Sequence, residues 1–130
     1  MYIVVYSHAG GSPYHGPNMR WYNIGHHLVK SNVDVTVVSS SFFHKYFKFP
    51  IIKRNITAEK IDGIDFLWIR TLKYKKRGLI QVLNQLHYTF KTIVLSLFWK
   101  RAAPSIVVAF SPPPLVIFPA YILSKKFNCP

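Results

Sequence analysis

A glycine pair stands in a polar loop directly after the first apolar segment of the chain. Residues 2–6 are apolar, residues 7–17 read SHAGGSPYHGP, and a helical pattern begins near Asn18. A strand that delivers glycines and polar side chains to the start of a helix is how α/β proteins build sites for phosphorylated ligands. Backbone N–H groups point at the anion there, and glycine has no Cβ to hold it away. The first 30 residues therefore predict a ligand site.

The charge balance indicates an anionic partner. Seventeen Lys and Arg against four Asp and Glu give 130 residues a formal charge of +13 at pH 7, and half of the residues are hydrophobic. This is enough apolar surface for one folded domain with a core, and it excludes a disordered chain. Nucleic acid, an anionic lipid surface and a sugar-nucleotide pyrophosphate are the candidate partners.

The cysteine content and the lengths of the apolar segments limit the expected cellular location of the chain. The single cysteine, Cys129, excludes an internal disulfide and a cysteine-based metal site. The first residues lack the basic region and small-residue cleavage site of a signal peptide. The longest later apolar stretch, residues 92–99, is far shorter than the ~20 residues that cross a bilayer. We expect a cytoplasmic chain.

Strand patterns alternate with helical patterns along the sequence. Asp62-Gly63 suits the two central residues of a hairpin turn, which need positive φ. Residues 42–55 have no clear period and predict a loop or short helix. The expected elements are strands at 2–6, 33–38 and 105–110, the last two buried, hairpin strands at 55–61 and 64–70, and helices at 19–30, 79–101 and 115–126. Such alternation predicts an α/β fold with a mostly parallel sheet.

Four blocks of sequence resemble the amino-terminal half of glycosyltransferase family 4. The blocks are residues 10–16 with Arg20 and Tyr22, 35–44, 61–71 and 109–114. The resemblance covers essentially the whole chain, and it is closest to the bacterial branch that adds N-acetyl-L-fucosamine and related sugars in O-antigen and capsule assembly. It implies that residues 1–130 are the acceptor-side, Rossmann-like domain of an incomplete GT-B fold, with flanking helices and an inserted β-hairpin.

The resemblance also implies an activity. Family members are retaining, metal-independent enzymes that move a sugar from a nucleotide-diphosphate donor to a sugar on a polyprenyl-diphosphate carrier, so we expect no metal and no cofactor. Their donor-binding domain holds a pair of glutamates, whereas this chain has one glutamate, Glu59. We therefore expect the donor domain and the catalytic residue beyond Pro130, and no sugar transfer by this chain alone. A second chain carrying the donor domain, as in a split enzyme, is the alternative.

The family motifs assign roles to five residues here. Gly10 and Gly11 match the loop that approaches the donor diphosphate, and the alternative is a tight turn between strand and helix. His15 and Arg20 match polar positions that contact acceptor or phosphate, or they are solvated side chains. Ser111 follows a predicted parallel strand, where open sheets bind ligands, although the prolines after it can simply begin a helix.

Two basic segments carry aromatic residues. Together they predict a surface that faces an anionic membrane, where rings lie at headgroup depth and each Lys or Arg contributes ~1 kcal/mol. The composition would also suit nucleic acid, but the lipid-linked acceptors that the family resemblance implies favour the membrane, so we expect a peripheral protein at the inner face of the cytoplasmic membrane. Nucleic acid ranks lower because no base-reading motif is present, and a solvated basic face stays open for either segment alone. The membrane-facing residues are Lys45, Phe47, Lys48, Lys73, Lys75, Lys76 and Arg77.

Overall fold

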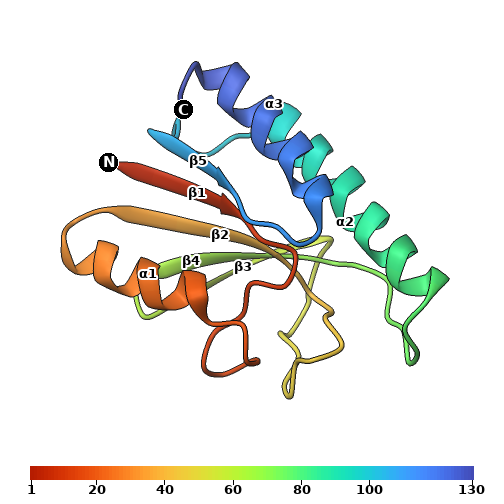
Figure 1. Ribbon diagram of the computed structural model, residues 1–130. Coiled ribbons are helices and arrows are strands. Elements are labelled where there is room, and N and C mark those ends of the chain that lie inside the picture. The colour runs from red at the N-terminus through yellow and green to blue at the C-terminus, as the bar shows by residue number, and fades with distance from the viewer.

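The computed structural model describes residues 1–130 as one α/β unit (Figure 1). Its elements in chain order are β1 (Tyr2–Tyr6), α1 (Arg20–Lys30), β2 (Asp34–Ser40), β3 (Ile56–Ile61), β4 (Ile64–Ile69), α2 (Leu79–Leu97), β5 (Ile106–Ala109), the 3₁₀ turn η1 (Pro114–Val116) and α3 (Ile117–Phe127).

Five strands form one mixed sheet in the order β3-β4-β2-β1-β5. Neighbours among β4, β2, β1 and β5 run parallel, and β3 pairs antiparallel with β4. Helix α1 covers one face of the sheet, and α2 and α3 lie together on the other (Figure 1). The predicted α/β class, the mostly parallel sheet and the hairpin are thus confirmed.

Alternating side chains of the central strands build two cores, one on each face of the sheet. Val4 and Tyr6 of β1 and Leu67 of β4 pack in the core beneath α2 and α3. Val37 of β2 and Phe66 of β4 pack in the core beneath α1. Because both faces are covered, β2 is buried along nearly its whole length, as its β-branched sequence predicts.

The hairpin turn forms at the predicted dipeptide and is held against α1. Asp62 and Gly63 both have positive φ, 48° and 86°, and Tyr22 of α1 donates a hydrogen bond from its hydroxyl to Asp62 Oδ2 (2.5 Å). A Cβ at Gly63 would lie 2.7 Å from Val29 Cγ1. Glycine is therefore required at this position for both its φ and its close contact with α1.

Two expected elements differ from the structure. Strand β5 is an edge strand and is only partly buried, because β1 is its sole strand neighbour, so its predicted full burial is wrong. Helix α2 ends at Leu97, four residues before the predicted end. Residues 42–55 form turns without a helix, so the loop is the one of the two predicted alternatives that forms. The backbone carbonyl of Pro130 accepts a hydrogen bond from Val107 N–H (2.8 Å), so the last residue lies beside β5.

No helix combines the length and apolar content that crossing a membrane requires.

The contact between the hairpin turn and α1 predicts that Gly63→Ala lowers the free energy of unfolding by about 2–3 kcal/mol, because it adds φ strain to a clash with Val29. Gly78→Ala is the control, since Gly78 also has positive φ (136°) but has no atom within 4 Å of its Cβ position. We expect it to cost about 1 kcal/mol. Urea unfolding measures both. Equal losses, or no relief of the Gly63→Ala loss in a Val29→Ala background, would contradict the clash.

Candidate functional site

A cleft of about 590 Å³ opens at the carboxyl edge of the parallel strands. Its walls come from the loops after β1, β2 and β5 and from the first turns of α2. The chain leaves β1 toward β2 on one side and later returns to β5 on the other side, so the strand order reverses at β1. Open α/β sheets bind their ligands at such a switch point, because the loops there diverge and leave a crevice.

His8, two residues after β1, lines the cleft and is held by a network of hydrogen bonds. Its Nε2 lies 2.7 Å from Asn84 Oδ1, and the Asn84 amide donates to Thr71 Oγ1 (3.1 Å) and to the Leu72 carbonyl. Because the amide nitrogen has acceptors for its protons, the amide oxygen must accept, and Nε2 of His8 carries the proton. Nδ1 is then an unprotonated acceptor, and it has no hydrogen-bond partner in the protein.

The surroundings of His8 keep its ring neutral. The ring is buried and makes edge contacts with Tyr88 and Phe43 (ring centroids 5.1 and 6.3 Å apart). Burial lowers the pKa of His8 to about 4, which the hydrogen bond to Asn84 opposes only in part. Near neutral pH the cleft therefore contains an uncharged imidazole that can accept a hydrogen bond from a hydroxyl group.

Cations from both predicted basic segments meet at this cleft. Lys45 from the loop after β2 and Arg77 from the segment before α2 line it. A hydrogen bond between His44 Nδ1 and the Tyr74 hydroxyl (3.0 Å) joins the two segments. Burial lowers the pKa of His44, and the charges of Arg77 and Lys45 lower it further. No Asp or Glu lines the cleft, so its charged groups are all positive.

Gly10 and Gly11 are buried within the loop after β1, and neither of them lines the cleft. Gly10 N–H donates to the Ser7 carbonyl (3.1 Å), and Gly11 N–H donates to the Asn18 carbonyl (3.0 Å). A Cβ at Gly10 would come within 3.1 Å of the Ser7 side chain and 3.2 Å of Val37. In this conformation both N–H groups are used inside the loop, and diphosphate binding through them requires the loop to open.

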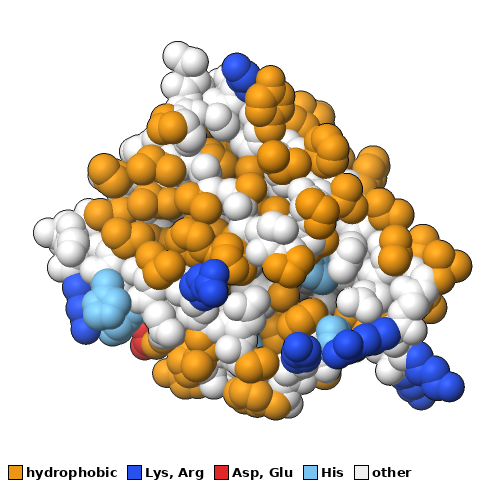
Figure 2. All heavy atoms as spheres, viewed as in Figure 1, with side chains coloured by type: hydrophobic (Ala, Val, Ile, Leu, Met, Phe, Trp, Pro, Cys, Tyr) orange, Lys and Arg blue, Asp and Glu red, His pale blue; other side chains and the backbone are white.

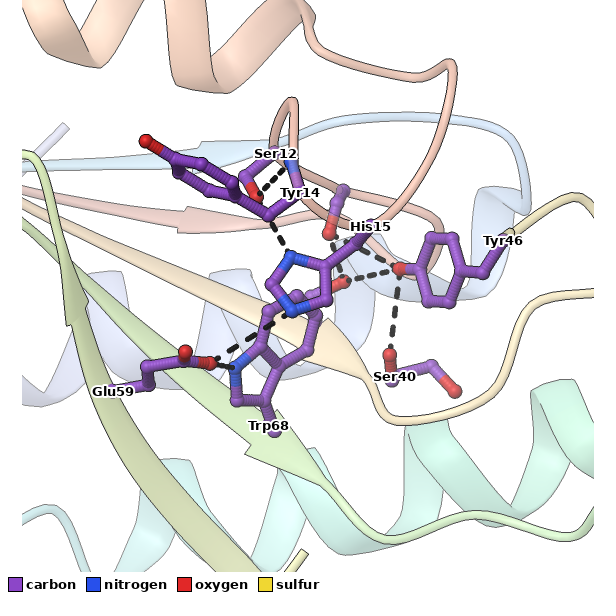
Figure 3. Close-up of polar contacts among 9 residues, drawn as sticks. Ser12, Tyr14, His15, Ser40, Tyr46, Glu59 and Trp68 are labelled. Carbon is purple, nitrogen blue, oxygen red and sulfur yellow. Dashed lines mark hydrogen bonds and ion pairs between the residues drawn. The ribbon is translucent and has the colours of Figure 1, made fainter. Parts of the chain in front are cut away.

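His15 lines a second hollow of about 430 Å³ that shares no lining residue with the cleft, and Figure 3 shows its polar contacts. Its Nδ1 hydrogen-bonds Ser12 Oγ (2.7 Å), and its Nε2 is 3.9 Å from Glu59 Oε2. The same carboxylate oxygen accepts from Trp68 Nε1 (2.7 Å), whose ring contacts His15. Burial lowers the pKa of His15, which the Glu59 charge opposes. These contacts tie the glycine loop to the hairpin.

Arg20 contacts Phe110 near the end of β5, Ser111 is the next residue of the chain, and neither Arg20 nor Ser111 lines the cleft. Arg20 is the first residue of α1, and its guanidinium stacks 5.1 Å from the ring centroid of Phe110. Ser111 is exposed directly after that ring. The structure therefore separates the five predicted contact residues into three places: the loop interior, the second hollow and the end of β5.

Among the groups that line the cleft, the sequence predicts Lys45 and Arg77 as membrane-facing residues, and it does not identify His8 as a site residue. The signal that could have found His8 is its position, because a polar residue just beyond the carboxyl end of a parallel strand lies at the edge where ligands bind. Its partner Asn84 was not recognisable, because only the packing of α2 on the sheet brings the two residues together.

Comparison of the chain with models of protein families, with curated proteins and with solved structures found no match. The fold class therefore rests on the strand order and connections, which are compatible with a Rossmann-like domain. Function has to be argued from the cleft.

The depressed pKa of His8 predicts that stability falls as the pH is lowered. In the unfolded chain His8 has its ordinary pKa of 6.5, whereas in the folded chain its pKa is about 4. Between these two pH values the unfolded state binds a proton at His8 and the folded state does not, so protonation favours unfolding. We expect His8 to account for about 2–3 kcal/mol of destabilisation between about pH 7.5 and about pH 4.5. Urea unfolding of the wild type and of His8→Gln at both pH values measures this difference. Equal pH dependence in the two proteins would contradict it.

Proposed function

We propose that this chain is the acceptor-side half of a retaining, metal-independent glycosyltransferase that moves a sugar from a nucleotide-diphosphate sugar to a glycan on a polyprenyl-diphosphate carrier. The observation that carries the proposal is the cleft at the switch point, where Lys45 and Arg77 stand beside the neutral imidazole of His8. The resemblance of the four sequence blocks to glycosyltransferase family 4 supplies the substrate class.

The groups in the cleft suit a phosphorylated sugar. Lys45 and Arg77 can neutralise diphosphate oxygens, and a guanidinium can bind two of them at once. His8 Nδ1 can accept a hydrogen bond from a sugar hydroxyl, while the amides of Gln81 and Gln85 can both donate and accept. Cations placed at a leaving diphosphate stabilise its developing charge, which is the main requirement of this transfer.

The donor half is proposed to come from residues other than these 130, either elsewhere in the same protein or on a second chain. Glu59, the only glutamate, bonds to Trp68 and lies beside His15 in the second hollow, so it is engaged in holding the hairpin to the loop. A pair of glutamates that holds the donor sugar therefore has no counterpart here. The proposed location is the inner face of the cytoplasmic membrane, where a lipid-linked acceptor would be found.

The proposal predicts that the chain binds diphosphates without a divalent metal. In calorimetric titrations with uridine diphosphate and with farnesyl diphosphate, we expect Arg77→Gln and Lys45→Gln each to weaken binding about tenfold, since a hydrogen bond to a charged group contributes about 1.5–3 kcal/mol. Lys30→Gln is the matched control. This substitution also removes one positive charge, but Lys30 is the last residue of α1 and lies at the opposite edge of the sheet from the cleft.

Equal weakening by all three substitutions would reduce the effect to net charge and contradict a specific site. Binding of neither diphosphate would overturn the proposal. Tighter, salt-sensitive binding of double-stranded DNA that displaces the diphosphates would favour the nucleic-acid alternative.

A further inference from the structure

Helix α2 has its polar side against the sheet and its apolar side in solvent. Asn84, Tyr88, Thr92 and Ser96, spaced four residues apart, are buried. The opposite side exposes large apolar residues, an arrangement contrary to that of an ordinary surface helix of an α/β protein. The exposed residues of this side are Leu79, Leu83, Leu86, Phe90, Val94 and Leu97.

Hydrogen bonds fix this orientation. The Tyr88 hydroxyl donates to the Val38 carbonyl (2.6 Å), and Ser96 Oγ lies 2.6 Å from the Tyr6 hydroxyl. Turning α2 to bury its leucines would leave these enclosed groups without partners, at a cost of about 1–3 kcal/mol each. The apolar side is therefore held outward by the fold.

Helix α3 extends the exposed apolar surface. It packs beside α2 on the same face of the sheet and exposes Ile117, Phe118 and Tyr121. We call these three residues, with the exposed apolar residues of α2, the α2–α3 face. Figure 2 shows hydrophobic side chains along the edge formed by these helices. Large exposed apolar side chains that adjoin one another in this way mark an interaction surface.

The part of the chain that forms the α2–α3 face carries charges of one sign. Residues 66–130 contain Lys and Arg but neither Asp nor Glu. A hollow of about 680 Å³ lies where Lys75, Lys76 and Arg77 meet Leu79 and Leu83, so cations border the apolar residues directly. Pairing of two copies through this face would bring these like charges together, which disfavours a self-dimer. An apolar face bordered only by cations suits the surface of an anionic bilayer.

We propose that the α2–α3 face lies on an anionic lipid bilayer, with Leu83, Leu86 and Phe90 among the acyl chains and Lys75 and Lys76 at the headgroups. Helix α2 lies in the plane of the interface, as its hydrogen bonds to the sheet require. Gln81 and Gln85 on its inner side, together with Arg77 just before the helix, line the cleft. The mouth of the cleft is thereby held at the lipid surface. The membrane contact itself does not depend on the proposed glycosyltransferase function. Only the presence of a lipid-linked acceptor at the cleft rests on that proposal.

Vesicle co-sedimentation tests this surface. We expect the chain to bind vesicles of phosphatidylcholine with phosphatidylglycerol, and Phe90→Ser to weaken partition about tenfold or more, because burial of a phenylalanine contributes about 1.5–3 kcal/mol. Phe47→Ser is the matched control, since Phe47 is 71% exposed and Phe90 67% exposed, and Phe47 lies in the other basic segment. Lys75→Gln with Lys76→Gln should weaken binding to anionic vesicles only, and rising salt should release the wild type.

Failure of the wild type to bind anionic vesicles would overturn the inference, as would equal loss in Phe47→Ser and Phe90→Ser. A dimer in solution that Phe90→Ser dissociates would show that a second copy covers the face. Diphosphate titration without vesicles separates this test from the proposed function, because Phe90 lies outside the cleft lining. Vesicle binding without diphosphate binding would retain the membrane surface and reject the glycosyltransferase.

Discussion

Hydrogen bonds, more than apolar contacts, set how helix α2 lies on the sheet. Asn84 near its start bonds His8, Tyr88 bonds the Val38 carbonyl of β2, and Ser96 bonds Tyr6 of β1. Each such bond contributes only about 1 kcal/mol net, yet a lost partner leaves a buried group unsatisfied at greater cost. These bonds therefore fix both the rotation of α2 about its axis and its position along the strands. The fixed orientation decides which side of the helix lines the cleft and which side is exposed.

The inner side of α2 determines the chemistry of the cleft. Asn84 holds the tautomer of His8, and its own orientation depends on Thr71, whose hydroxyl lies 2.7 Å from Ser40 Oγ. This chain of bonds joins the ends of β1, β2 and β4 to the helix, so the acceptor atom of His8 is held by four elements at once. Because the His8 ring is neutral, it can accept a hydrogen bond from a hydroxyl group of a ligand. Lys45, which lines the same cleft, remains free to bind the phosphate of that ligand.

Sequence patterns predicted the local features of the fold and missed those that depend on distant partners. The Asp62-Gly63 turn and β1 were predictable because turn geometry and strand period are encoded in adjacent residues. The burial of β5 was not, since strand order decides which strand lies at the edge. The apolar period of α2 predicted a helix, but period alone does not say which side meets the sheet. The glycine loop shows the same limit, because its N–H groups bond to Ser7 and Asn18 and only the folded loop reveals this.

The few carboxylates of the chain explain why its charge is unevenly distributed. All four precede Phe66, and three are engaged around the hairpin, where Asp62 accepts from Tyr22, Asp65 pairs with Lys60 and Arg101, and Glu59 accepts from Trp68. The negative charge thus lies toward the hairpin, and the segment that forms α2 and α3 retains only cations. An anionic surface would exert a torque on such a molecule as well as an attraction. This torque would turn the α2–α3 face toward the anionic surface, and the same face exposes the unpartnered apolar side chains. Electrostatic attraction and hydrophobic burial therefore favour the same orientation.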